Sequence, residues 1–154
     1  MTIVPNQCPI CTSAAKVQEF TERTTVSCFR CGKFAITSTA LKSAPSPSKD
    51  EIPKISGWIR ENQDVTIRVE NLPRIGELRM PSVGEKAERI LMWLSHKCPI
   101  PGTAFVFQSQ FNQPRYSGDD LLEMQAVGWT SDANESFFLL NEYLCKEKEP
   151  AFGN

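Results

Sequence analysis

The chain has 154 residues, a formal net charge of −1, 40% hydrophobic residues and 23% charged residues, which is ordinary for a folded soluble protein. This length suits one medium domain, or a small domain with a larger one. No apolar run approaches the roughly 18–20 residues of a membrane span, and Met1–Pro9 lacks the basic-then-apolar pattern of a signal peptide. We therefore expect a cytoplasmic protein with no membrane partner.

The first predicted unit is a small ribbon over residues 5–42. Alternating polar and apolar residues predict three short strands, at 16–20, 24–27 and 33–37. Residues 43–50 then include two prolines and three serines, which cannot continue a strand or helix, so we expect a linker there.

The second predicted unit, residues 51–147, is mainly helical, and residues 148–154 form a tail. Apolar residues at helical spacing predict a helix near 52–62, followed by an extended segment at 65–69 and a short helical turn at 71–78. Ser82 with Glu85 is a capping-box pattern that begins a helix ending before Pro99.

A short strand at 105–107 and two further helices complete this unit. Ser117 with Asp120 begins a helix to about Val127, and Asp132 begins another, from Ala133 to about Lys146. Helix, strand, helix, turn, helix is the order of a winged helix, although no wing hairpin is evident. The expected fold class is α+β: an N-terminal ribbon followed by a winged-helix-like body.

Four of the six cysteines form two close pairs, Cys8 with Cys11 and Cys28 with Cys31, separated by sixteen residues. This is the spacing of a tetrahedral zinc site, in which a two-residue turn aims both sulfurs of a pair at one ion. These turns closely resemble those of zinc ribbons, which implies that the four cysteines are ligands and that Gly32 is a turn residue. Thr12 departs from the pattern, since glycine is common there.

Four thiolates would fill the tetrahedron and leave no position for water or substrate, so we expect one structural zinc ion. Other candidates for chemistry are weak. The single histidine, His96, stands near a helix end, and Asp119 and Asp120 fall in a first helical turn, where carboxylates are expected anyway. Cys98 and Cys145 are expected to be buried as small apolar side chains. No enzyme is predicted.

Charge is spread unevenly along the chain, with +3 over residues 1–48, +2 over 49–115 and −6 over 116–154. The best candidates for nucleic-acid contact are the basic residues of the ribbon, Lys16, Arg23, Arg30 and Lys33. A second basic set interleaves with acidic residues, which is typical of a mixed solvated surface; it comprises Arg60, Arg68, Arg74 and Arg79.

Three segments (31–37, 55–61 and 81–86) resemble the N-terminal region of bacterial stress or phage-defence effectors. In those proteins a ribbon and a helical region precede a domain related to nucleoside deoxyribosyltransferases or TIR domains. Because the chain ends at Asn154, we expect either a shortened chain or a free-standing partner of a separate effector chain.

Two functions follow as hypotheses. The first is a zinc-binding interaction or regulatory module that recruits or controls a partner protein, in bacterial stress or phage defence. The second is a nucleic-acid-binding regulator that uses the ribbon and the winged helix. The acidic residues of the last helix, including Glu135 and Glu142, argue against its entry into a phosphate-lined groove. The oligomeric state is not indicated.

Overall fold

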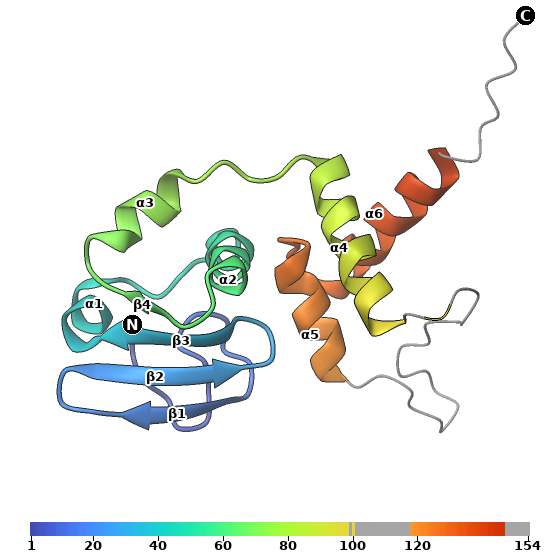
Figure 1. Cartoon of the computed structure of the whole chain (residues 1–154). Helices are drawn as coiled ribbons and strands as arrows, with labels where there is room; N and C mark the ends of the chain where they lie inside the picture. Colours follow the sequence, from blue (N-terminus) through green and yellow to red (C-terminus); the bar gives the residue numbers. More distant parts are fainter. Residues whose placement is uncertain (99, 101–117, 147–154) are drawn as a thin grey trace, which may run out of the picture.

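The structure, a computed structural model, describes residues 1–98, 100 and 118–146. These residues form a mixed α/β molecule, in which a four-stranded sheet lies at one end and three helices, α4 to α6, lie at the other (Figure 1). The predicted strand at 105–107 and the tail at 148–154 lie outside the described residues. Among the described residues, no helix has both the length and the apolar character needed to cross a membrane.

The sheet begins with three antiparallel strands at the predicted positions. These are β1 (Ala15–Glu19), β2 (Arg23–Cys28) and β3 (Gly32–Thr37). A fourth strand, β4 (Val65–Ile67), pairs parallel to β3, so that Phe34 lies opposite Val65 and Ile36 opposite Ile67. Parallel strands need a long crossover connection, and here the chain between β3 and β4 supplies it with two helices.

These crossover helices are α1 (Ser38–Ser43) and α2 (Glu51–Glu61), and a third helix, α3 (Asn71–Glu77), follows β4. The helix predicted near 52–62 and the helical turn at 71–78 are confirmed. Helix α1 was not expected; the Thr37 hydroxyl caps it by accepting a hydrogen bond from the Ala40 N–H.

One hydrophobic core joins the strands to the crossover. Buried side chains of the sheet, among them Val26, Phe34 and Ile36, share a cluster with Ile59 of α2 and Ile67 of β4. The four paired cysteines belong to the same cluster. The segment predicted as a linker, 43–50, therefore does not separate two cores, because residues on both sides of it pack together.

A second, smaller core lies between α4 (Val83–Lys97), α5 (Gly118–Val127) and α6 (Ala133–Lys146). The capping box of α4 is confirmed in both directions, between the Ser82 hydroxyl and the Glu85 N–H and between the Glu85 carboxylate and the Ser82 N–H. Cys98 is half-buried at the end of α4. Three helices of this kind do not by themselves establish a winged helix.

Candidate metal centre

The two cysteine pairs meet at one buried point, at the end of the sheet where β2 turns into β3. Cys8 and Cys11 lie in the segment before β1, Cys28 is the last residue of β2, and Cys31 lies in the turn that leads to β3. Their four sulfur atoms all lie within 4.8 Å of one another, and no side chain of the four is more than 8% exposed. The cluster can therefore hold one metal ion, as the sequence predicts.

The sulfur separations fit shared coordination and exclude disulfide bonds. The Sγ atoms of Cys8 and Cys31 are 3.8 Å apart, and those of Cys11 and Cys28 are 3.5 Å apart. A disulfide would bring the atoms to about 2.05 Å. A tetrahedral ion with sulfur ligands at ~2.3 Å would place them about 3.8 Å apart. None of the four clustered cysteines takes part in a disulfide bond.

Each turn is held by local hydrogen bonds. In the first, the Thr12 N–H donates to the Cys8 carbonyl at 2.9 Å; in the second, the Cys31 N–H points at the Cys28 sulfur at 3.5 Å. Gly32 has a φ of +87°, which confirms its predicted role as the turn residue. Thr12 also has a positive φ, of 61°, so this β-branched residue adopts the conformation that favours glycine.

The protonation of the four thiols is interdependent. Interaction with the Cys11 sulfur raises the pKa of Cys8 and of Cys31 above the ordinary value, while a hydrogen bond with Cys28 lowers the pKa of Cys11. Four buried sulfurs in contact cannot all ionise unless a cation offsets their mutual repulsion. A divalent ion with a preference for soft ligands suits this donor set.

Arg30 lies between the cysteines of the second pair and points away from solvent. Its side chain is 6% exposed. Nη1 donates to Oε1 of Gln125 at 2.7 Å, and Nη2 donates to the carbonyl of Thr130 at 2.7 Å. The guanidinium of Arg30 is therefore occupied by Gln125 of α5 and by the turn that follows α5, and this burial does not favour the predicted contact with nucleic acid.

Helix α2 holds the same turn from another side. Arg60 donates from Nε to the carbonyl of Arg30 at 3.1 Å, and from Nη2 to the carbonyl of Phe29. Its Nη1 lies 3.8 Å from the Glu123 carboxylate of α5. Arg60 thus links the turn that carries Cys28 and Cys31 to α5.

A close helix contact, which periodicity could not predict, completes this junction. A Cβ on Gly57 of α2 would lie only 2.4 Å from the ring of Trp129. The indole Nε1 of Trp129 donates to Glu61 at 3.1 Å, and Arg89 of α4 lies over the same ring, 5.3 Å from its centroid. Trp129 itself has a φ of 53°, so tertiary contacts hold a strained backbone there.

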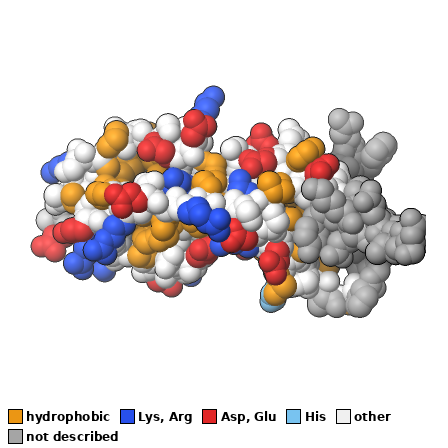
Figure 2. Space-filling model, turned by 90° about the horizontal axis from the view of Figure 1, so that it is seen from above, with side chains coloured by type: hydrophobic (Ala, Val, Ile, Leu, Met, Phe, Trp, Pro, Cys, Tyr) orange, Lys and Arg blue, Asp and Glu red, His pale blue; other side chains and the backbone are white. Residues whose placement is uncertain are grey.

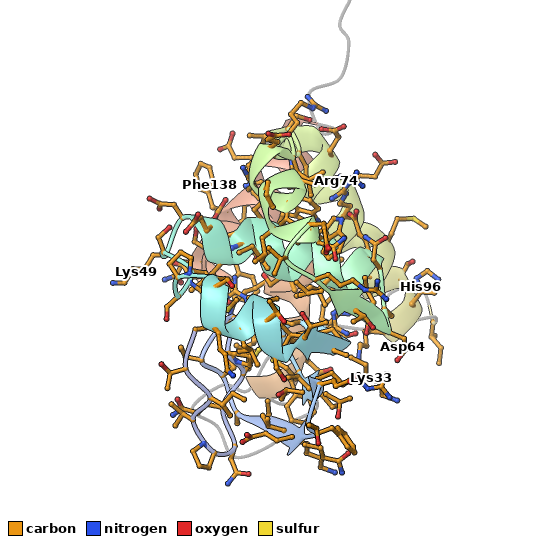
Figure 3. All side chains as sticks on the ribbon, turned by 90° about the vertical axis from the view of Figure 1, so that its left-hand side faces the viewer. Lys33, Lys49, Asp64, Arg74, His96 and Phe138 are labelled. Carbon is orange, nitrogen blue, oxygen red and sulfur yellow. The ribbon has the colours of Figure 1, made fainter. Side chains whose placement is uncertain are left out.

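The other three predicted basic residues meet on one surface. Lys16, Arg23 and Lys33 are exposed and line a single hollow on the sheet face opposite the core. Figure 3 shows Lys33 and Lys49 on opposite sides of the molecule. Three of the four basic residues thus lie on one surface, whereas the fourth, Arg30, is buried. Their contact with nucleic acid stays a prediction.

The remaining candidates make contacts within or between helices. His96 is exposed, with Nδ1 2.7 Å from the Met92 carbonyl within its own helix. Asp120 forms an ion pair with Lys97 at 3.0 Å. Acidic and basic side chains are interspersed over the face seen from above (Figure 2), in keeping with the predicted mixed surface.

Comparison with known proteins gives this chain no relative. No protein family, curated protein or solved structure matches it. The resemblance to bacterial defence effectors is therefore supported by no match, and the four clustered cysteines are the feature consistent with a zinc ribbon.

Proposed function

We propose that this protein is a zinc-stabilised, non-enzymatic binding module that recruits or controls a partner protein. The observation that carries the proposal is the buried cluster of four cysteine sulfurs. We propose zinc because this ion binds four thiolates in a tetrahedral arrangement and is itself redox-inactive. Metal-binding thiols persist in a reducing compartment, so the proposed location is the cytoplasm.

A binding role is favoured over catalysis by the closed geometry of the cluster. Cys8, Cys11, Cys28 and Cys31 would supply all four ligands, so a bound ion would offer no position to a substrate. The ion would instead contribute folding free energy to the two turns that carry its ligands. Bacterial stress or phage defence is the setting that the sequence resemblance implies for such a module.

The junction around Arg30 supports a rigid binding platform. Arg30 and Arg60 connect the metal-binding turn to α5 and to the turn between α5 and α6. Ligation of the ion would therefore order one end of the molecule and help to place the helices at the other end. A partner protein could then bind the sheet end and the helical end of the molecule at the same time, as one continuous surface.

Metal analysis tests the zinc-binding part of this proposal. The purified wild-type chain should carry about one zinc ion, and Cys28→Ser should lose it. Cys98→Ser is the matched control, because the half-buried Cys98 lies outside the cluster, and it should retain the ion. A folded, zinc-free wild-type chain would contradict the proposal.

A partner test separates the protein-binding function from its alternative. We expect a stoichiometric second chain to remain bound through gel filtration and to dissociate when a chelator removes zinc. Purification of the chain alone, with salt-sensitive affinity for nucleic acid, would instead support a nucleic-acid-binding regulator. This second candidate is favoured by one observation, the convergence of Lys16, Arg23 and Lys33 on the open sheet face.

A further inference from the structure

We infer that the open face of the sheet is a binding site for the phosphate backbone of single-stranded nucleic acid. This inference extends the second candidate function above and does not depend on a protein partner. The site is a hollow of about 380 Å³, and it is lined by side chains from all three antiparallel strands and by the start of the β4 segment.

Strand register explains how the basic residues come together. Lys16 of β1 lies opposite Ser27 of β2, and Ser27 lies opposite Lys33 of β3. This row therefore has a lysine at each end and a hydroxyl between them. On the opposite face of the sheet, Val26 and Phe34 point into the core, so the alternation of the strands directs the row outward.

The next row forms the floor of the hollow. Gln18, Thr25, Ala35 and Thr66 lie side by side across the four strands. Their side chains are small or uncharged, which leaves space above them, and the hydroxyl and amide groups can bond to sugar or phosphate oxygens. Arg23, opposite Thr37, stands at the far end of the hollow.

The spacing of the cations favours an extended polyanion over a single small ion. Lys16 and Lys33 are two strands apart, which is about 10 Å, and Arg23 stands about 13 Å along β2 from Ser27. One phosphate ion cannot contact all three side chains. A chain of phosphates can follow them, and neutralisation of its charges would release counterions.

Charge in and around the hollow is consistent with this ligand. Three basic side chains line it, against one carboxylate, Asp64, which lies near Lys33 (Figure 3). The acidic helix α6 lies at the other end of the molecule (Figure 1), so it does not repel a strand bound on the sheet. Beyond Arg23, a neighbouring hollow is lined by Arg68 as well as by Glu22 and Glu70, so charges of both signs meet there.

The recessed shape of the hollow favours single-stranded over double-stranded nucleic acid. Duplex DNA is read by a protruding helix or ribbon that enters a groove, whereas this surface is recessed. The one aromatic residue of the lining, Phe34, is 3% exposed, so it offers no ring on which a base could stack. Binding should therefore depend on phosphates and be independent of base sequence.

Fluorescence anisotropy with labelled oligothymidylate and oligouridylate tests the inference. With three phosphate contacts, each adding ~0.7 to the salt slope, affinity should fall about 20-fold between roughly 50 and 200 mM salt. Lys33→Ala removes one contact, so its affinity should fall only about 7-fold over the same range. Lys49→Ala is the matched control, because Lys49 is exposed on the opposite side (Figure 3), and it should behave as the wild type.

Three results would overturn the inference: no salt-sensitive binding by the wild type, an equal effect of Lys49→Ala and Lys33→Ala, or tighter binding of polyglutamate than of either oligonucleotide. The last would assign the face to an acidic protein. Zinc content, measured on the same samples, keeps the two proposals distinct. A zinc-loaded chain that fails to bind contradicts this inference alone, and a zinc-free chain that binds contradicts the zinc-module proposal alone.

Discussion

Arg30 Nη1 donates a 2.7 Å hydrogen bond to Oε1 of Gln125, 95 residues further along the chain. Because Arg30 stands between Cys28 and Cys31, this bond connects the metal-binding turn directly to α5. The same guanidinium donates to the Thr130 carbonyl, so its buried charge is well supplied with acceptors.

Arg30→Ala should therefore destabilise the protein without removing its metal. The substitution leaves the Gln125 and Thr130 oxygens buried without this donor, and we expect the free energy of unfolding to fall by about 2–4 kcal/mol. Urea unfolding measures the change. Arg23→Ala, which removes the same charge from an exposed site, should change it by less than about 0.5 kcal/mol. Equal stability of the two variants would show that the Arg30 contacts contribute nothing.

Gly57→Ala tests the contact between α2 and Trp129. Alanine is the better helix former, but its Cβ would overlap the indole ring, so we expect a loss of about 1–3 kcal/mol. A shift in tryptophan fluorescence should accompany the loss, because the ring must move. Gly84→Ala is the control, since a Cβ there meets nothing within 4 Å, and it should leave stability equal or slightly higher. A stable Gly57→Ala protein with an unchanged spectrum would refute the contact.

Thr12→Gly should stabilise the first cysteine turn. Threonine at a φ of 61° is strained by about 1 kcal/mol or more, and glycine relieves that strain. The converse change, Gly32→Ala, should destabilise the second turn, because its φ is +87° and the new Cβ would meet the Gln63 side chain. Thermal unfolding of the zinc-loaded variants measures both. If the unfolding temperatures of both variants shifted in the same direction, the backbone strain assigned to Thr12 would be contradicted.

Glu135 gives a pH-dependent contribution to stability. Partial burial opposes its ionisation, but hydrogen bonds from the Ser131 N–H and from Lys86 lower its pKa below 4.5. Its carboxylate therefore stabilises the folded state above about pH 4.5, and this contribution is lost as the pH falls through the lowered pKa. The stability difference between the wild type and Glu135→Gln should be present at pH 7 and disappear in acid. Because metal loss in acid affects both proteins, a difference that grows as the pH falls would contradict the assignment.

Local signals in the sequence predicted the local parts of the structure. Cysteine spacing located the metal cluster, and Ser82 with Glu85 located the start of α4, because ligand turns and helix caps are set by residues close in sequence. Long-range packing was not predictable in this way. Nothing near Arg30 in sequence marks its acceptors in α5 and in the following turn, so it was assigned to the surface with its basic neighbours.

The parallel pairing of β4 was missed for a related reason. Residues 65–67 have the alternating pattern of a strand, but this pattern does not indicate with which strand they pair. The proline-rich segment 43–50 also suggested a boundary between the ribbon and the helical body. Pairing with β3 places those residues in the core of the ribbon. Similarly, the hollow that gathers Lys16, Arg23 and Lys33 depends on the strand register, which the sequence alone did not supply.

X-ray absorption at the zinc edge of the purified wild-type protein tests the central claim most directly. The account predicts a first shell of four sulfur atoms at ~2.3 Å, with no oxygen or nitrogen ligand. A shell containing oxygen or nitrogen, or fewer than four sulfurs, would contradict a closed site formed by Cys8, Cys11, Cys28 and Cys31.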